Sequence, residues 1–571
     1  LDTGQVVEIG WRRDFTRSPM AIANPNVRLI VLLHCALFLS VAWHARAVQP
    51  NIVWIVAEDI SPIIAPYGDT TAPTPALSEL AREGVRYTNA FSTSGVCAPS
   101  RAALATGMYP THIGANHMRT GPWVRSEVAP ETIARYRDRM PAGVLPYEAI
   151  PPAPVRMLSE ILRRNGYYAS NRAKADHQFR APPTAWDDSS AQAHWRNRPD
   201  AAQPFFAVFN IGVTHESQIW ARPERPLLIP EDAELPIPPY LVDDAATRAD
   251  YRRLYSNVIE MDRAVAGLIG ELRDARLLDN TWVFFFGDHG GPMPRQKRLL
   301  YDSGLRVPLI IRPPGGRVPA EEDTESRLVS FVDFLATTLS LAGIDVPDWT
   351  QGVAFLGTAD PGPRAYVYAA ADRFDETTDA IRAVRDQRFK YLRNLRPDQG
   401  YYLPLRYREQ MASMQSLLAG HEAGTLTDAQ AQWFRESKPA EELFDTWSDP
   451  HELDNLVGDP EHARVLEVLR NEYELWAARI DDTGAGDERE YFESLWPAGR
   501  QPQTLPPVFA HLGDGRLRIT SATEGASVGF RFGDETVWRP YVGPVLVPSG
   551  TRVAAVAHRI GYTRSRIRVL R

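Results

Sequence analysis

From residue 51 onward, short apolar runs alternate with stretches in which apolar residues recur at helical spacing. The runs at 51–57, 205–211 and 281–286 are apolar almost throughout, as expected of strands that are buried on both faces of a sheet. Helices are predicted at 75–84, where a proline occupies the first turn, and at 155–166. This alternation predicts an α/β fold in which helices cover both faces of a sheet.

The pattern changes after residue 350. Residues 382–392 predict a pair of strands and residues 442–456 a strand leading into a turn, which indicates a smaller α+β subdomain. The stretch 495–508 is rich in proline and glutamine, has no periodicity and is predicted to be a linker. Short β candidates separated by glycine and proline then predict a small β-sandwich: 516–521, 527–532, 545–547, 552–558 and 565–570.

The N-terminal segment combines basic residues with an apolar run. Residues 29–42 are mostly apolar, and residues 45–47 offer a small-x-small cleavage site. The run follows four arginines: Arg12, Arg13, Arg17 and Arg28. The arrangement is typical of an export signal and predicts a mature chain that begins near Val48, lies in the periplasm or outside the cell, and has no membrane anchor. A buried helix is the alternative, since the run is shorter than the roughly 20 residues that span a bilayer.

Charge and cysteine content narrow the possible functions. The net charge of −8 is spread without long runs of one sign, so nucleic acid is not a predicted partner. Of the two cysteines, Cys35 falls inside the export signal, and Cys97 would remain alone in an oxidising compartment. A lone thiol there is either chemically active or a small buried hydrophobe.

Acidic residues follow two of the predicted strands directly. Glu58 and Asp59 come after the strand 51–57, and Asp288 and His289 come after the strand 281–286. Ligands of open α/β sheets gather at the carboxyl ends of the central strands, so these side chains can meet. A mostly oxygen set suits a hard divalent cation such as Ca²⁺. Taken separately, each pair could equally be a helix cap or a solvated turn.

Cys97 stands in the run Cys97-Ala98-Pro99-Ser100-Arg101, which leads into a helical stretch that closes at Thr106-Gly107. Pro99 suits the first turn of a helix, so Cys97 is predicted to lie just ahead of a helix N-terminus. Free backbone N–H groups and the helix dipole favour anions there, and Arg101 adds a positive charge. The sequence therefore predicts a site for an anionic group such as sulfate or phosphate.

With this run the chain resembles the formylglycine-dependent sulfatases of the alkaline-phosphatase superfamily. In that family a Cys-x-Pro-Ser-Arg run followed by Thr-Gly directs oxidation of the cysteine to formylglycine (3-oxoalanine). The resemblance spans residues 50–480 and includes four further segments: Thr74-Pro75, Arg306–Pro308, Val332-Asp333 and Asp449–Glu452. It implies an alkaline-phosphatase-like, mixed but mostly parallel sheet, and maturation by a formylglycine-generating enzyme.

The resemblance also implies a Ca²⁺ ion and its ligands. These would be Glu58, Asp59, Asp288, His289 and an oxygen of the formylglycine made from Cys97. Two positions depart from the commoner pattern, because Glu58 stands where an aspartate is commoner and His289 where an asparagine is common. Both substitutes keep a donor atom, so metal binding is still expected.

The implied reaction starts from the hydrated aldehyde of residue 97, one oxygen of which attacks sulfur and expels the sugar or aryl oxygen. The resemblance assigns sulfate contacts to Lys174, His215 and Lys297, with Arg101 supporting the hydrate. His215 could also protonate the leaving oxygen. Substrate contacts are predicted further out, with solvated loops as the alternative, at His117, Arg119, Asp176, Arg373 and Asp375. His177 or Asp176 could orient the hydrate where many members have a histidine.

The predicted domain organisation combines the resemblance with the pattern. It comprises an N-terminal extension and export signal (1–47), a catalytic domain (48–355), a C-terminal subdomain (356–497), a linker (498–508) and a β-sandwich (509–571). The tail is similar to small β domains appended to hexosaminidases, through segments such as 523–527 and 559–562. Its Trp538 and Tyr541 fit a sandwich core as well as a sugar platform.

The predicted function is hydrolysis of sulfate esters, on a sulfated polysaccharide or its oligosaccharides, by a sulfuric ester hydrolase. Two alternatives stay open at this point. A phosphonate or phosphate ester hydrolase of the same superfamily could use the same metal, formylglycine and basic pocket. A non-catalytic secreted carbohydrate-binding protein would keep Cys97 as an unmodified thiol.

Overall fold

The computed structural model describes residues 49–118, 131, 134, 140–317 and 323–571. The predicted export signal and Arg119 lie outside the described residues. Residues 50–571 fold as one compact unit.

An eight-stranded sheet in the order β4-β3-β5-β1-β6-β7-β2-β8 forms the centre of this unit. Strand β7 is antiparallel to both of its neighbours, and every other adjacent pair is parallel. The three strands predicted from apolar runs are β5, β1 and β6, which lie side by side in the middle of the sheet. The strands are β1 (Asn51–Ala57), β2 (Val85–Phe91), β3 (Tyr168–Arg172), β4 (Asp188–Ser190), β5 (Phe205–Ile211), β6 (Thr281–Gly287), β7 (Arg306–Arg312) and β8 (Thr324–Ser330).

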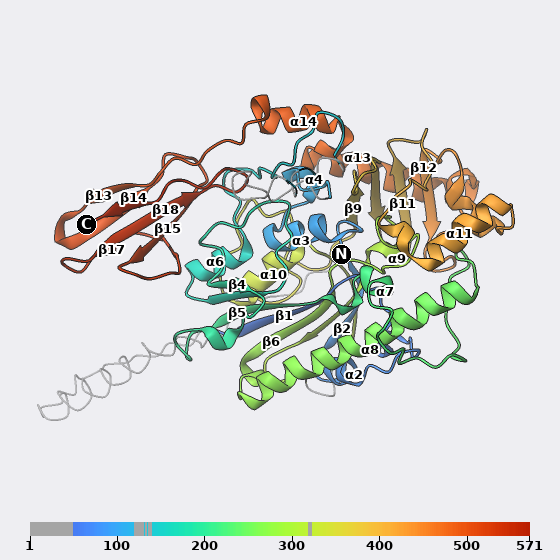
Figure 1. Ribbon diagram of the computed structural model, residues 1–571, viewed down its shortest axis with the longest axis horizontal. Coiled ribbons are helices and arrows are strands. Elements are labelled where there is room, and N and C mark those ends of the chain that lie inside the picture. Colours follow the sequence, from blue (N-terminus) through green and yellow to red (C-terminus); the bar gives the residue numbers. More distant parts are fainter. Residues whose placement is uncertain (1–48, 119–130, 132–133, 135–139, 318–322) are drawn as a thin grey trace, which may run out of the picture. The chain divides into compact units, whose positions relative to one another are not determined.

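Alternate residues of β1 enter two different cores, because successive side chains of a strand point to opposite faces. Val53 and Ile55 pack with helices α2 (Pro75–Arg82) and α8 (Ala245–Asp274). Ile52 and Trp54 pack with the opposite layer, which consists of α3 (Cys97–Thr106), α6 (Leu158–Arg164) and α10 (Asp333–Leu341). Figure 1 shows these two helical layers on either side of the sheet. The predicted α/β fold with a mostly parallel sheet is confirmed.

One predicted helix begins later than its pattern suggested. The helix expected at 155–166 starts at Leu158, because Met157 has an extended backbone with a ψ of 143°, and Val155 instead donates its N–H group to the carbonyl of Pro152 at 3.1 Å in a turn. The remaining helices are short or lie outside the sheet layers: α4 (Pro110–Ile113), α7 (Ser217–Trp220), α9 (Asp302–Leu305), α11 (Ala412–Ala423), α12 (Asp428–Ala431), α13 (Ala463–Ile480) and α14 (Glu488–Leu495). In the part of the chain that the structure describes, no helix has both the length and the apolar composition needed to cross a membrane.

A second, antiparallel sheet carries the predicted subdomain. Its order is β12-β11-β10-β9, formed by β9 (Val367–Ala371), β10 (Ile381–Arg385), β11 (Phe389–Asn394) and β12 (Glu441–Asp445). The strand pair predicted at 382–392 is β10 and β11, with Ala383 opposite Leu392. Helix α13 packs against these two strands, and α11 packs against α8.

The C-terminal segment forms two small antiparallel sheets around a shared core of Leu517, Ile519, Phe530, Val553 and Ala555. The first sheet consists of β13 (Val508–His511), β14 (Arg516–Thr520) and β17 (Val545–Leu546). The second consists of β16 (Arg539–Pro540), β15 (Ser527–Phe532), β18 (Val553–His558) and β19 (Arg568–Leu570). The predicted β-sandwich is therefore present.

The sandwich is joined to the rest of the unit through buried contacts. Ser527 donates to Glu160 at 2.8 Å, and Arg163 of α6 donates to the carbonyl of Trp538 at 2.9 Å. The stretch predicted as a linker is tied to the sandwich by a β-bridge between Gln503 and Thr563. Scattered contacts hold the stretch, among them the buried side chain of Trp496 and the hydroxyl of Thr504, which accepts from the N–H group of Arg559 at 3.1 Å. The predicted domain boundaries stay a prediction.

Candidate active site

The carboxyl ends of β1 and β6 bring the two predicted acidic segments together. The strands are parallel neighbours with Ala57 opposite Gly287, so the residues that follow them are adjacent. The N–H group of Asp59 donates to Asp288 Oδ1 at 2.9 Å, and Asp59 takes a left-handed φ of 49° there. Asp59, Asp288 and His289 are each completely buried.

Cys97 reaches this pair of segments from the helix that follows β2. It is the first residue of α3 and 2% exposed, whereas the sequence predicted a position just ahead of the helix. Its Sγ lies 3.4 Å from His289 Nε2 and 3.9 Å from Asp59 Oδ1. The hydroxyl of Ser100, one turn further on, donates to the carbonyl of Asp288 and so ties the helix to the strand end.

Four predicted groups form a compact donor set. One side-chain donor atom from each of Asp59, Cys97, Asp288 and His289 lies within 4.8 Å of the others. His289 Nε2 is 3.0 Å from Asp59 Oδ1 and 3.8 Å from Asp288 Oδ1. Two carboxylates and one imidazole beside residue 97 are a donor set that could hold a divalent cation.

Glu58 lies beside this set but outside it. Its carboxylate forms an ion pair with Lys174 at 3.0 Å and faces Arg101 at 3.8 Å. With Asp59 and His215 it belongs to a second group of donors that lie close together. The predicted ligand role of Glu58 stays a prediction.

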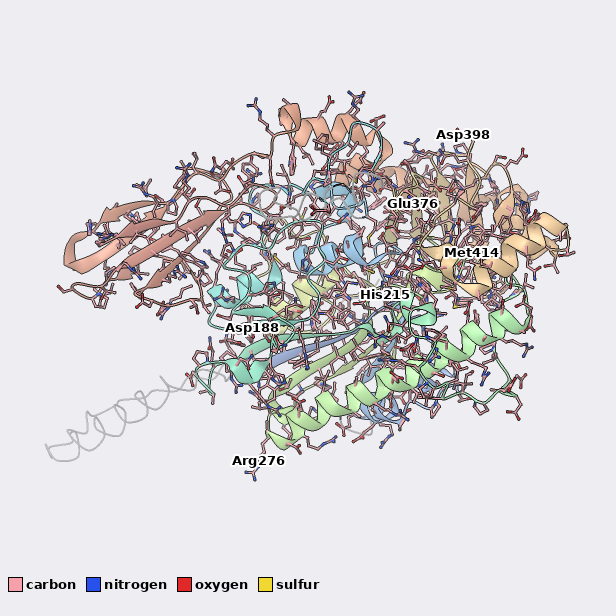
Figure 2. All side chains as sticks on the ribbon, in the orientation of Figure 1. Asp188, His215, Arg276, Glu376, Asp398 and Met414 are labelled. Carbon is pink, nitrogen blue, oxygen red and sulfur yellow. The ribbon has the colours of Figure 1, made fainter. Side chains whose placement is uncertain are left out.

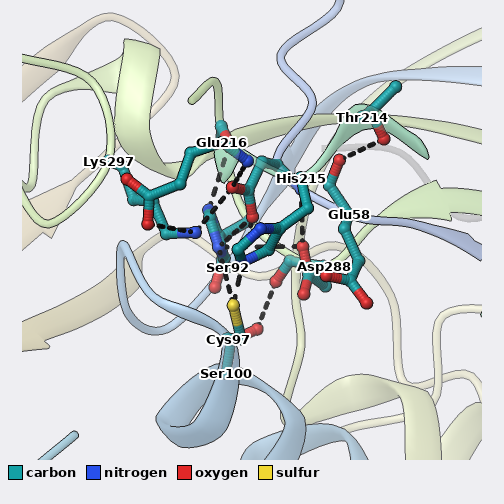
Figure 3. Close-up of polar contacts among 12 residues, drawn as sticks. Glu58, Ser92, Cys97, Ser100, Thr214, His215, Glu216, Asp288 and Lys297 are labelled. Atoms are coloured by element: carbon teal, nitrogen blue, oxygen red, sulfur yellow. Dashed lines mark hydrogen bonds and ion pairs between the residues drawn. The ribbon is translucent and has the colours of Figure 1, made fainter. Parts of the chain in front are cut away.

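Basic side chains converge on the same place, as Figure 3 shows for Lys297 and His215 around Cys97. Lys297 Nζ lies 2.5 Å from Asp59 Oδ2 and 3.1 Å from Glu216 Oε1. His215 follows β5, and its Nδ1 lies 2.9 Å from the hydroxyl of Ser217.

Arg101 is held on the other side of the donor set. Its guanidinium contacts Asp288 Oδ2 at 2.9 Å and Asn210 Oδ1 at 2.5 Å. Together with Lys174, Lys297 and His215, it surrounds residue 97 with cationic or protonatable groups. The structure thus brings all five predicted catalytic residues together.

The field of these cations acts on the thiol. Burial alone would raise the pKa of Cys97, but the charges of Lys174 and Lys297 lower that pKa to about 6. Burial alone would lower the pKa of His289, but the charges of Asp288 and Asp59 raise that pKa to about 10. The site therefore stabilises negative charge at residue 97.

Two residues that the sequence reasoning missed support this arrangement. Glu216 accepts hydrogen bonds from both terminal nitrogens of Arg298, at 2.9 and 2.8 Å, in addition to its contact with Lys297. Its burial is outweighed by Arg298 and Lys297, which lower the pKa of Glu216 to about 2. Glu216 directly follows the predicted His215, and Arg298 directly follows the predicted Lys297. A charged residue next to a predicted site residue was the signal in the sequence that could have identified both.

The predicted substrate contacts lie in different surroundings. Arg373 is fully buried and pairs with Glu488 at 2.6 and 2.9 Å, and His117 Nδ1 accepts from the N–H of Arg373 at 3.3 Å. Asp375 faces Arg298 at 3.4 Å, while Asp176 is half-buried beside the buried His177. Substrate contact by these residues stays a prediction.

Comparison with known proteins identifies the family. The Sulfatase family model matches residues 50–344, and the model described as N-sulphoglucosamine sulphohydrolase, C-terminal, matches residues 294–403. An ulvan-active sulfatase of Formosa agariphila is 47% identical, over 91% of this chain and 90% of that protein. The chain belongs to the sulfatase family.

More distant relatives agree with this assignment. Human N-sulphoglucosamine sulphohydrolase is 26% identical to this sulfatase, over 78% of this chain and 94% of that enzyme. A protein solved in complex with its substrate D-glucosamine-2-N,6-O-disulfate has the same fold, with a TM-score of 0.52 and 16% identity over 77% of this chain and 100% of that one. The predicted sulfuric ester hydrolase is confirmed, which sets aside the alternative of a non-catalytic binding protein.

Proposed function

We propose that this sulfatase removes sulfate from a polysaccharide or its oligosaccharides, using a formylglycine made from Cys97 and a bound Ca²⁺. One observation carries the proposal: the Cys97 Sγ lies within 4 Å of both Asp59 and His289, inside a ring of basic side chains. An oxidised residue 97 would therefore have cation ligands on one side and donors for a sulfate group on the other.

The charges of the site suit this pair of ligands. Five buried carboxylates face four permanent cations; the carboxylates are those of Glu58, Asp59, Glu216, Asp288 and Asp375, and the cations are Arg101, Lys174, Lys297 and Arg298. A divalent cation brings two positive charges and the sulfate ester of a substrate brings one negative charge, so the two would partly offset each other at this site. Buried charges that stay unpaired are costly, so the two would support each other.

The predicted ligands for the ion are Asp59, Asp288, His289, residue 97 and Glu58. When bound, the ion would make the hydrate of residue 97 more acidic and would withdraw charge from the sulfate oxygens. Lys297 uses two of its three ammonium donors on Asp59 and Glu216, which leaves a third for a sulfate oxygen. Lys174 and Arg101 hold the opposite side.

Hydrolysis then needs three proton transfers at residue 97 and the leaving oxygen. One hydroxyl of the hydrate loses its proton and attacks sulfur, and the bond from sulfur to the sugar oxygen breaks as that oxygen takes a proton. His215 is the proposed donor. Burial and the charge of Lys297 lower its pKa, but the charge of Asp59 and a hydrogen bond that the ring donates to the sulfur of Cys97 raise it above its usual value. Loss of the proton from the second hydroxyl re-forms the aldehyde and releases sulfate.

The substrate class rests on the relatives. The relative at 47% identity is named as active on ulvan, and the human relative acts on a sulphated glucosamine by its name. We expect export to the periplasm or beyond to give this enzyme access to such polymers.

The decisive experiment is mass analysis of the tryptic peptide Tyr87–Arg101 from protein co-expressed with a formylglycine-generating enzyme. Conversion of the thiol to the aldehyde lowers the peptide mass by about 18 units. The same preparation should hydrolyse sulfated glycans, lose activity in a chelator and regain it with Ca²⁺. An unmodified thiol in a sample where a control sulfatase is converted would contradict the nucleophile, and faster turnover of matched phosphate or phosphonate esters would contradict the substrate class.

A further inference from the structure

Arg408 is a buried arginine whose charge has no carboxylate partner among the described residues. Its side chain is 5% exposed, and it donates one hydrogen bond, to the carbonyl of Leu403 at 2.7 Å. Its Nε has no hydrogen-bond partner in the part of the chain that the structure describes. A guanidinium offers five N–H donors, so most of its hydrogen-bonding capacity is unused within the described protein.

Other buried arginines of this chain are better satisfied. Arg298 and Arg382 each bond a carboxylate through two nitrogens. Arg253 and Arg295 lack a carboxylate but each donates two hydrogen bonds to main-chain carbonyls. Because buried charges are normally paired, the position of Arg408 calls for an explanation.

Two contacts place the residues next to Arg408 against segments that neighbour the reaction centre. The ring of Tyr407 packs edge-on against Trp220 of α7, the helix that starts two residues after His215, with the ring centres 5.3 Å apart. The N–H group of Arg406 donates to Glu376 at 3.0 Å, next to the Asp375 that faces Arg298. In Figure 2, Glu376 and Met414, which lies shortly after this segment, appear in the small subdomain beyond His215.

The electrostatics agree with this location. Burial and the charge of Arg298 lower the pKa of Arg408 to about 10. The carboxylate of Glu409, its chain neighbour, is used by the hydroxyl of Tyr402 at 2.6 Å and the N–H of Leu405 at 3.0 Å. Arg408 is therefore close enough to the reaction centre to be repelled by Arg298 and attracted by Glu216, and a further anion beside it would offset the cost of burying its charge.

We propose that Arg408 forms an anion-binding subsite that takes a carboxylate or a second sulfate on the sugar next to the scissile ester. The planar fork of an arginine suits both groups, since each offers two oxygens to paired donors. The inference rests on the proposed function, because it presumes a sulfated glycan as substrate. It makes Arg408 a specificity residue that selects polyanionic glycans over singly charged ones.

The competing explanation is structural. The guanidinium lies 4.7 Å from the ring centre of Trp433 and 5.3 Å from that of Tyr402, and such cation–π contacts can hold an arginine in a core. A purely structural Arg408 would affect stability and all substrates alike. A subsite would affect only substrates that carry the second anion.

The test compares Arg408→Gln with the wild type on three sulfated disaccharides. The first carries a uronic acid, the second is the same molecule with its carboxylate reduced to an alcohol, and the third carries a second sulfate instead. Loss of a charge-assisted bidentate contact should lower kcat/KM roughly 10- to 100-fold on the first or the third disaccharide. On the reduced disaccharide, kcat/KM should change less than about twofold. The disaccharide whose kcat/KM falls shows whether the subsite takes a carboxylate or a second sulfate.

Controls separate this outcome from damage to the fold. Arg406→Gln removes an arginine two residues away whose side chain is 79% exposed, and it should leave all three rates unchanged. Arg408→Lys, which keeps the charge, should recover part of the selectivity. An equal loss on all three substrates, or none, would overturn the subsite.

A binding measurement keeps this inference separate from the proposed function. Calorimetry with the doubly sulfated and the uronic disaccharides on a Cys97→Ala protein, with and without Arg408→Gln, needs no turnover. Weaker binding only in the double variant supports the subsite even if the native enzyme cleaves neither disaccharide, a result that would count against the proposed function alone. Equal affinity in both proteins would refute the subsite.

Discussion

Two buried groups of charged side chains differ in how they share their partners. In the first, here called the paired cluster, Arg373 bonds Glu488 at 2.6 and 2.9 Å, and Arg382 bonds Asp482 at 2.5 and 3.0 Å. Arg373 meets one carboxylate through two parallel contacts, and Arg382 meets Asp482 in the same way while its third nitrogen faces Asp372 at 2.9 Å. Such bidentate pairs fix a geometry and leave little capacity for a further ligand.

At the reaction centre, single atoms serve several partners. Asp59 Oδ2 accepts from Lys297 at 2.5 Å and from the N–H of Glu216 at 2.7 Å, while Asp59 Oδ1 faces His289 at 3.0 Å. A carboxylate shared in this way can be offered to a cation while its other partners hold it in place. The difference teaches that shared partners, more than burial or charge alone, distinguish the reactive group from the supporting one.

The largest expected effect is at the nucleophile. Cys97→Ala should reduce kcat by a factor on the order of 10⁴ or more, because it removes the residue from which the proposed nucleophile is made. The same variant should change the melting temperature little, since it removes one small buried atom. Turnover of a sulfated oligosaccharide measures the loss of kcat, and calorimetric melting measures the melting temperature. Retained turnover would show that the reactive group lies elsewhere.

The paired cluster should show the opposite behaviour. Arg382→Met removes a completely buried guanidinium and leaves Asp482 and Asp372 without their partner. Breaking a buried pair in this way costs about 3–5 kcal/mol of unfolding free energy. Denaturant unfolding should show this loss, while kcat of the folded fraction stays within a few-fold of the wild type. A large loss of kcat without a loss of stability would place Arg382 in the catalytic machinery.

Much of the reaction centre could be predicted from the sequence because it depends on local features. Asp59 and Asp288 follow the ends of two strands, and the Cys97–Arg101 run starts a helix. Short segments of sequence therefore determine most of the arrangement of side chains in the reaction centre. The paired cluster could not be predicted, because Arg373 and Glu488 are 115 residues apart and nothing in either segment indicates the other. For the same reason, His117 and Arg373 were predicted as substrate contacts or solvated loop residues, and their shared contact with Glu488 was not predicted.

The C-terminal sandwich was only partly predictable from the sequence. Its strands were visible from turn spacing, and β15 and β18 follow the predicted ranges closely. Its attachment was not visible, because the contact of Ser527 with Glu160 joins residues 367 positions apart. Sequence patterns report periodicity within an element, and they say little about which faces meet.

Buried lysines offer a sharper version of the comparison. Lys297→Met should lower kcat/KM by roughly 10²–10³, the typical effect of removing one donor that stabilises developing charge. Lys438 is the matched control, because its side chain is completely buried and bonds Asp379 at 2.8 and 2.7 Å. Lys438→Met should destabilise the protein but keep kcat/KM within a few-fold. Equal kinetic losses in both variants would contradict the distinction.

The smallest expected effect concerns His117, at the edge of the paired cluster. Burial lowers its pKa to about 4, against the opposing charge of Glu488, so the folded protein binds a proton there more weakly than the unfolded chain does. Between about pH 6.5 and pH 4 the unfolded state therefore holds more protons, and stability should fall as the pH falls through this window. His117→Asn should flatten that part of the profile by up to about 3 kcal/mol, as read from denaturant unfolding at a series of pH values. If the slope survives the substitution, His117 is not a buried neutral member of the paired cluster, and its predicted contact with substrate regains support.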